Sequence, residues 1–160
     1  TDASAHNGSV RFRERVTPTI FAFLVSAMVI PAVLIVFWPI NATVGIILAV
    51  ACYLGICLML WLSSPVIEID STTLRVGSAR VPLRHIGDVT AYADRDRARM
   101  AAGPELDARA WTCLRGWAPL SVRVEISDPL DPVPYWLFST RRPVELQREL
   151  KRAAAAVQQR

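Results

Sequence analysis

Few side chains in this sequence have the type and spacing that catalysis requires. The two histidines, His6 and His85, stand next to no cysteine or serine motif. The chain contains no glycine-rich phosphate loop and no nucleophile elbow. Because a catalytic site is identified by residues that fill defined chemical roles, we expect that the protein is not an enzyme.

The sequence also contains few side chains that could bind a metal ion. Asp128 and Asp131 form a pair of carboxylates with no third ligand in view, and hard cations prefer more oxygen ligands than that. Cys52, Cys57 and Cys113 lack the paired spacing of a zinc site or of a disulfide framework. The sequence therefore predicts no metal site and no cofactor.

Two groups of arginines could contact the phosphates of lipid headgroups. The first group precedes a long apolar stretch, and its members are Arg11, Arg13 and Arg15. The second group lies in segment 93–108, and its members are Arg95, Arg97 and Arg99. Acidic residues alternate with the second group, which is typical of a solvated helix or surface loop. The net charge of +4 is compatible with a nearby anionic membrane but indicates no dedicated nucleic-acid surface.

A candidate protein-interaction surface combines aromatic side chains with stiff polar turns. Residues 128–136 contain two Asp-Pro turns followed by two aromatic residues, and residues 115–119 form another turn. Large aromatic side chains beside a rigid polar loop are typical of binding hot spots. The alternative is that residues 128–134 are only a proline-stiffened connection between strands. The members of the candidate surface are Arg115, Trp117, Asp128, Asp131, Tyr135 and Trp136.

These side chains belong to a chain dominated by one uncharged stretch, residues 16–67. None of its 52 residues is charged. A membrane-spanning helix needs about 20 apolar residues, so the stretch is long enough for two. Pro39 and Asn41 indicate the turn between them. We therefore predict spans at 17–38 and 42–62, with a kink in the first at Pro31.

The charges that flank the two spans predict their orientation. Arginines precede the first span, whereas residues 39–41 between the spans carry no charge. Because positively charged flanks stay in the cytoplasm, we expect a two-pass plasma-membrane protein with both termini cytoplasmic. The long apolar region and the absence of a small-residue cleavage site disfavour a cleaved signal peptide. Neither span contains Asp, Glu, Lys, Arg or His, which disfavours a self-contained transporter.

The remainder of the chain predicts a small antiparallel β domain. Alternating apolar residues indicate strands at 67–70, 73–76 and 79–83, and Gly77-Ser78 is typical of a type II′ hairpin turn. Further strands are expected at 110–114, 121–127 and 135–140. We expect a final helix at about 141–158, because its apolar residues recur at helical spacing, with Thr140 as its N-cap.

The predicted fold class is therefore an α+β membrane protein in three parts. Residues 1–16 form a basic cytoplasmic tail, in which Phe12 could enter the membrane interface. Residues 17–62 form the transmembrane hairpin, and residues 63–160 form the cytoplasmic β domain with its closing helix.

This order of elements resembles bacterial proteins with pleckstrin-homology-like membrane domains. The run Val66-Ile-Glu-Ile-Asp-Ser-Thr-Thr-Leu-Arg-Val-Gly, followed by Val81-Pro-Leu-Arg-His-Ile-Gly-Asp-Val, is similar to the first three strands of such domains. The resemblance implies a pleckstrin-homology-like fold for residues 63–160, and it suggests lipid headgroups as candidate ligands.

A second resemblance covers most of the chain. It is carried by Val10-Arg-Phe-Arg-Glu-Arg, by Leu106-Asp-Ala-Arg-Ala and by Asp128-Pro-Leu-Asp-Pro-Val-Pro-Tyr-Trp-Leu-Phe-Ser-Thr-Arg-Arg-Pro. These runs are similar to a family of small actinobacterial membrane proteins, the domain-of-unknown-function family 3093. The resemblance implies an integral membrane protein, and it supplies no activity and no catalytic residues.

The sequence thus predicts a membrane-anchored interaction or scaffold module at the inner face of the membrane. Its expected partners are the bilayer and either another protein or a second copy of itself, and not nucleic acid. One alternative is that the β domain senses lipid headgroups. A further alternative is an accessory subunit of a membrane complex, whose partner would supply the polar pathway that these spans lack.

Overall fold

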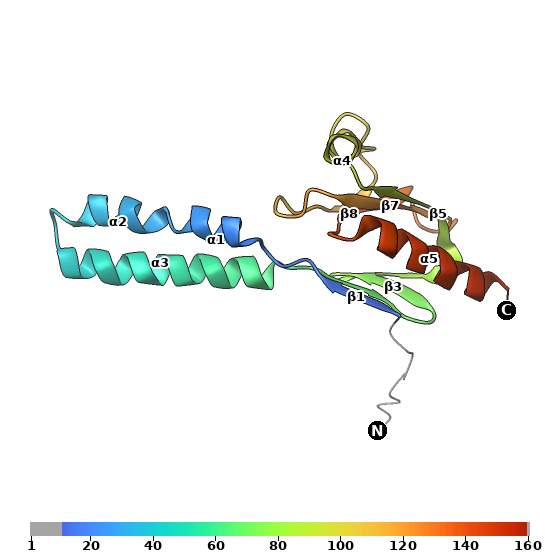
Figure 1. Cartoon of the computed structure of the whole chain (residues 1–160), viewed down its shortest axis with the longest axis horizontal. Helices are drawn as coiled ribbons and strands as arrows, with labels where there is room; N and C mark the ends of the chain where they lie inside the picture. Colours follow the sequence, from blue (N-terminus) through green and yellow to red (C-terminus); the bar gives the residue numbers. More distant parts are fainter. Residues whose placement is uncertain (1–10, 160) are drawn as a thin grey trace, which may run out of the picture. The chain divides into compact units, whose positions relative to one another are not determined.

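The computed structural model describes residues 11–159, which form two compact units (Figure 1). One unit is an apolar helical hairpin, Thr17–Ser64. The other, called the β unit below, contains residues 11–16 together with residues 65–159. The chain therefore begins the β unit, leaves it for the hairpin, and returns to complete it.

The hairpin contains three helices, α1 (Ile20–Ser26), α2 (Val29–Phe37) and α3 (Ala42–Leu62). Both Ile20–Phe37 and Ala42–Leu62 are long and apolar enough, by length and composition, to cross a membrane. The second predicted span, 42–62, has the bounds of α3. Asn41 caps α3, because its side-chain oxygen accepts hydrogen bonds from the backbone N–H groups of Thr43 and Val44.

The first predicted span is not one continuous helix. Residues 27 and 28 separate α1 from α2, and the hydrogen bonds there join residues three apart, as from Met28 N–H to the Val25 carbonyl at 3.1 Å. Pro31 has no N–H to donate to the carbonyl of Ala27, and its ring crowds that carbonyl. The Ser26 hydroxyl also donates to the Ala22 carbonyl at 2.7 Å, an arrangement that bends helices. The predicted kink is thus a break one turn before the proline.

The first sheet of the β unit contains four antiparallel strands in the order β1-β2-β3-β4. Their bounds are β1 Phe12–Arg15, β2 Val66–Ile69, β3 Thr73–Val76 and β4 Ala79–Pro82. Between β3 and β4, Gly77 has a φ of +59° and Ser78 does not have a positive φ. Only the first central residue therefore adopts the left-handed conformation, as the predicted type II′ turn requires.

Strand β1 corrects the prediction that residues 1–16 are only a tail. Residues 12–15 pair with β2 in register, with Arg13 opposite Glu68. Phe12 and Val16 are buried in the core, so Phe12 is a core residue and not a side chain that enters a membrane interface. In residues 11–16, arginines alternate with Phe12, Glu14 and Val16, which is the period of a strand. The prediction used these arginines only as a charge pattern.

The second sheet has the strand order β5-β7-β8-β6. Its members are β5 Ile86–Tyr92, β6 Trp111–Cys113, β7 Ser121–Ile126 and β8 Tyr135–Ser139. β6 pairs with β8 in parallel, whereas the other pairs are antiparallel. A short 3₁₀ turn, η1 (Leu83–His85), joins the two sheets, and α4 (Arg95–Ala102) lies between β5 and β6 in the sequence.

The two sheets share one hydrophobic core with the last helix, α5 (Pro143–Gln158). Leu146, Leu150, Ala153 and Ala154 are the buried stripe of this helix, as their helical spacing predicts. The fold of the chain is therefore α+β, with two apolar helical segments, mainly antiparallel sheets and a closing C-terminal helix (Figure 1).

Candidate functional site

The aromatic pair proposed as a docking surface is buried. Tyr135 and Trp136 each expose 5% of their surface. The Trp136 ring lies 4.7 Å from that of Trp111, and the Tyr135 hydroxyl accepts a hydrogen bond from Asp107 N–H at 2.8 Å. Strand β8 lies between β7 and β6, and all five of its residues are buried. The prediction that these two rings are exposed is therefore wrong, because Trp136 faces the main core and Tyr135 faces a second apolar cluster on the other side of the sheet.

The two aspartates beside that pair shape the loop between β7 and β8. The Asp128 carboxylate accepts a hydrogen bond from Leu130 N–H, and the Asp131 carboxylate accepts one from Val133 N–H, both at 3.0 Å. Each is the Asx-turn geometry expected of a stiff connection. Among residues 11–159, no three His, Cys, Asp or Glu side chains gather as a metal site would require. Leu130, at the tip of this loop, is 93% exposed.

The remaining members of the candidate surface are Arg115 and Trp117. They belong to a turn that is hydrogen-bonded to two other segments of the β unit. Arg115 N–H donates to the Ser139 hydroxyl at 2.9 Å, which joins the turn to the end of β8. Trp117 donates its indole Nε1–H to the carbonyl of Val16 at 3.1 Å. Val16 is the last residue of the β unit before the chain enters the hairpin. The turn is thereby tied to the point where the chain leaves the β unit.

Sequence reasoning missed a buried carboxylate, Glu14, which joins β1 to the segment between β8 and α5. Glu14 is 6% exposed, and its carboxylate accepts hydrogen bonds from the Thr140 hydroxyl at 2.5 Å and from Arg141 N–H at 2.8 Å. Thr140 is not the N-cap of α5, because that position is Arg142, although the Thr140 hydroxyl accepts a hydrogen bond from Arg142 N–H at 3.1 Å. The available signal was the position of Glu14 between the inward-facing Phe12 and Val16 of an alternating strand.

The basic residues of β1 lie on its outer face. Arg13 forms an ion pair with Glu68 at 3.2 Å, and Glu68 also lies 3.8 Å from Arg75. Arg11 and Arg15 are exposed. Such exposed pairs contribute little to stability. The lipid contact predicted for Arg11, Arg13 and Arg15 stays a prediction.

The second arginine group is divided by the geometry of α4. Asp94 caps this helix, accepting a hydrogen bond from Arg97 N–H at 3.3 Å. Arg95 and Arg99 are four residues apart and therefore lie on one side of the helix. Both line a cavity of about 320 Å³. Arg97 lies on another side, where it lines a separate cavity together with Asp96 and Glu105.

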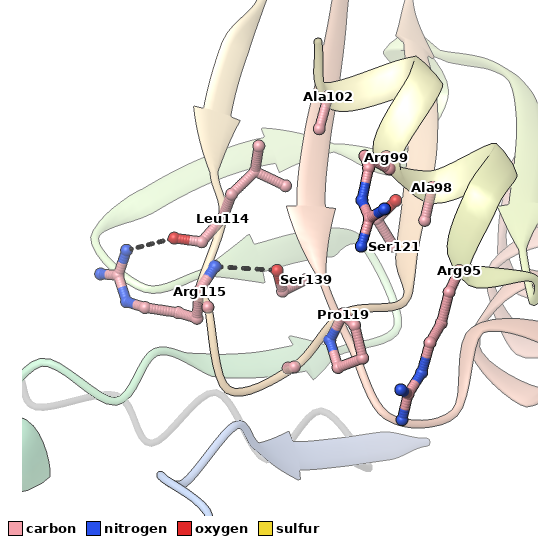
Figure 2. Close-up of a pocket in the computed structure, with 11 residues that line it drawn as sticks. Arg95, Ala98, Arg99, Ala102, Leu114, Arg115, Pro119, Ser121 and Ser139 are labelled. Atoms are coloured by element: carbon pink, nitrogen blue, oxygen red, sulfur yellow. Dashed lines mark hydrogen bonds between the residues drawn. The ribbon is translucent and has the colours of Figure 1, made fainter. Parts of the chain in front are cut away.

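The cavity beside Arg95 and Arg99 is bounded by α4, by the turn at residues 114–119, and by the paired ends of β7 and β8 (Figure 2). Ser121 and Ser139 are opposite one another in the β7–β8 register and form its polar floor. Figure 2 shows the Arg99 side chain extending toward Ser121. The Arg115 guanidinium extends away from the cavity and donates to the Leu114 carbonyl at 2.9 Å.

The electrostatics of this cavity favour an anion. Among the residues that the structure describes, no acidic side chain lines it, and neither Arg95 nor Arg99 forms an ion pair. The Ser121 hydroxyl is buried, and its oxygen has no hydrogen-bond partner within residues 11–159. Two guanidinium groups and a free hydroxyl are donors suited to an oxyanion. This arrangement is suited to binding an anion.

Two titratable groups near the cavity have shifted pKa values. Hydrogen bonds from the backbone and side chain of Arg109 lower the pKa of Asp107, which remains ionised as it orders the connection before β6. Partial burial raises the pKa of the Cys113 thiol, so this thiol is protonated at neutral pH. Neither group lines the cavity.

The fold and these sites define a small α+β protein in which an apolar helical hairpin interrupts a β unit that carries a basic cavity. The chain belongs to the family described as "Protein of unknown function (DUF3093)", which matches residues 11–150. The match includes β1 and the hairpin and ends halfway along α5. No curated protein and no solved structure gives a significant match to the chain.

Proposed function

We propose that this protein is a two-pass plasma-membrane protein whose β unit is a cytoplasmic interaction module. In this proposal the module binds a protein partner, or a second copy of the chain, at the inner face of the membrane. Its two sheets and closing helix belong to a pleckstrin-homology-like fold. The proposal places both termini in the cytoplasm, because arginines flank the first span on that side.

The observation that carries the proposal is the insertion of the hairpin between two paired strands. β1 and β2 are hydrogen-bonded along all four residues of each strand, yet the whole hairpin lies between them in the sequence. A membrane-inserted hairpin would hold the β unit through both strands, with almost no linker. Such a module reaches only partners in the layer next to the membrane, which suits a scaffold.

The surface available for a partner differs from the one first predicted. Tyr135 and Trp136 are excluded because they are buried. The candidates that remain are the half-buried turn that carries Arg115 and Trp117, and the loop whose tip is the exposed Leu130. A rigid loop with one exposed apolar side chain provides an anchor that loses little entropy on binding.

The proposal is tested by crosslinking the full-length protein in its native membranes and identifying what co-purifies. We expect a stoichiometric partner, or a discrete crosslinked oligomer, that is lost with Arg115→Ala or Leu130→Ala. Arg148→Ala, which removes an exposed arginine from α5, is the matched control and should leave capture unchanged. Recovery of the chain alone, with neither partner nor self-crosslink, would overturn the proposal.

The second candidate function is recognition of lipid headgroups by the β unit. It is favoured by one specific observation, the cavity lined by Arg95 and Arg99 with the unpartnered Ser121 hydroxyl in its floor. A third candidate, an accessory subunit of a membrane complex, requires a partner that supplies polar groups, because no Asp, Glu, Lys, Arg or His lies within α1, α2 or α3.

A further inference from the structure

We propose that the cavity between α4, the 114–119 turn and the ends of β7 and β8 is a binding site for a phosphate group. The phosphate is carried by a lipid headgroup or is present as a free anion. The site belongs to the β unit alone, and only its lipid form rests on the proposed membrane location.

The first argument is the Ser121 hydroxyl. Ser121 is 2% exposed, lines the cavity, and has no hydrogen-bond partner for its Oγ among the described residues. Nearly all buried polar groups in folded proteins are hydrogen-bonded, because leaving one unpaired is costly. An oxyanion in the cavity would accept a hydrogen bond from this hydroxyl and remove that cost.

The neighbouring serine supplies a second donor. Ser139 is 3% exposed and stands opposite Ser121 across β7 and β8. Its oxygen accepts the hydrogen bond from Arg115 N–H. A hydroxyl that accepts one hydrogen bond still has its own proton to donate. The floor of the cavity therefore presents two adjacent hydroxyl groups, one of them with its oxygen already fixed in place.

The α4 side of the cavity adds the positive charges of Arg95 and Arg99. Arg95 and Arg99 project from the same side of α4, are exposed at the cavity, and form no ion pair within residues 11–159. The acidic residues of this region do not line the cavity. Asp94 is used as the helix cap, and Asp96 lines the other cavity with Arg97. Because the guanidinium fork matches phosphate geometry, two such groups favour that anion.

The size and donor set identify the chemical class. A volume of about 320 Å³ is at the lower end for small-molecule pockets, which span roughly 300–1,000 Å³. It accommodates a phosphate with a small substituent. Two arginines and two serines line the cavity, and a tetrahedral anion with several acceptor oxygens can use their donors more fully than a carboxylate with two.

The position of the site in the chain explains how a headgroup could reach it. One wall is the turn whose Trp117 side chain is hydrogen-bonded to Val16, the last residue before the hairpin. Val16 directly precedes the hairpin in the sequence and would lie at the headgroup layer if the hairpin is inserted. Lipid phosphates are concentrated in that layer, and free phosphate reaches the same donors from solution.

The structure provides a matched control for the test. Arg97 carries the same charge on the same helix but lines the other cavity. The full-length protein, reconstituted in nanodiscs of phosphatidylcholine, is titrated with inorganic phosphate at constant ionic strength, and saturable binding is followed by calorimetry. We expect the double variant Arg95→Gln/Arg99→Gln to weaken binding by at least about tenfold, since charged hydrogen bonds are lost. Arg97→Gln should change it by less than about twofold, because screened surface charges contribute little.

Ser121→Ala separates a built site from general attraction to a basic surface. This variant keeps every charge, and we expect it to weaken phosphate binding several-fold, because one of the donors is lost. Equal losses in Arg97→Gln and the Arg95/Arg99 double variant, or no effect of Ser121→Ala, would overturn the proposal. Absence of saturable binding by the wild-type protein, in every nanodisc tested, would also overturn it.

The source of the phosphate is resolved by a second arm of the same experiment. Nanodiscs that contain phosphatidylglycerol are compared with those of phosphatidylcholine alone. Loss of saturable inorganic-phosphate binding in phosphatidylglycerol discs, with that binding kept in phosphatidylcholine discs, assigns the site to a lipid headgroup. Unchanged binding in both discs assigns it to the free anion. Neither outcome depends on capture of a protein partner, so this proposal and the proposed interaction function fail separately.

Discussion

At the scale of single residues, the two neighbouring serines of the cavity floor should affect stability in opposite directions. Ser121 leaves a buried hydroxyl without a partner, whereas Ser139 satisfies the backbone N–H of Arg115. Without phosphate, Ser121→Ala should keep the free energy of unfolding or raise it by up to about 1 kcal/mol. Ser139→Ala should lower it by about 1–2 kcal/mol, because a buried N–H loses its acceptor. Urea unfolding of the full-length protein in detergent, followed by tryptophan fluorescence, measures both. Destabilisation by Ser121→Ala would mean that its hydroxyl has a partner in solution.

Glu14 should be the carboxylate that most strongly supports the β unit. Its two oxygens accept hydrogen bonds from Thr140 and from Arg141 N–H, at a position that is 6% exposed. Glu14→Gln turns an amide NH₂ toward one of these donors, and we expect a loss of about 1–3 kcal/mol. Glu68→Gln, on the adjacent strand, removes only exposed ion pairs and should cost less than about 1 kcal/mol. The same unfolding measurement compares them, and equal losses would contradict a special role for Glu14.

At the scale of elements, the two glycines of α3 should differ in their tolerance to substitution. A side chain at Gly45 would meet the Cβ of Phe37 at 3.0 Å, whereas one at Gly55 would meet nothing within 4 Å. Gly45→Leu should therefore separate α2 from α3 and cost about 1–3 kcal/mol, the usual range for overpacking. Gly55→Leu should leave the hairpin intact. Thermal unfolding midpoints in detergent decide this, and the reverse ranking would indicate that Gly55 contacts another chain.

Local sequence patterns were sufficient for the elements whose partners are close in sequence. The bounds of α3, the Gly77 turn and the buried stripe of α5 follow from composition, turn chemistry and helical spacing. Strand β1 was missed because its partner β2 lies beyond the whole hairpin in the sequence. The parallel pairing of β6 with β8 could not be predicted from the sequence for the same reason, because no local pattern identifies a strand's distant neighbour.

The candidate site was only partly predictable for a related reason. The arginines of α4 were identified from their charge, but only helical geometry separates Arg95 and Arg99 from Arg97. Ser121 gave no signal, because a serine that starts a strand is unremarkable until its neighbours are known. Tyr135 was mistaken for a surface residue because the exposed Asp-Pro loop precedes it, while its burial depends on α4 and on residues 106–114.

At the scale of the whole molecule, the order β1, hairpin, β2 makes membrane topology and folding of the β unit interdependent. Strands β1 and β2 must both be on one side of the membrane to pair. If the hairpin crosses the bilayer twice, the connection at Ile40 between α2 and α3 must emerge on the opposite side from Ser78, which lies in the β3–β4 turn. An odd number of crossings would leave β1 and β2 unpaired and expose the core residues Phe12 and Val16.

This dependence predicts the accessibility of two single cysteines in a chain whose three native cysteines are replaced by alanine. In intact cells, a membrane-impermeant maleimide should label Ile40→Cys, whose native side chain is 76% exposed. It should label Ser78→Cys, at an exposed turn position, only after the membrane is opened. Labelling at both positions in intact cells would place the β unit outside and contradict the cytoplasmic assignment. Labelling at neither before lysis, with both labelled afterwards, would show that the hairpin does not cross the membrane, and the anchoring proposed here would fail.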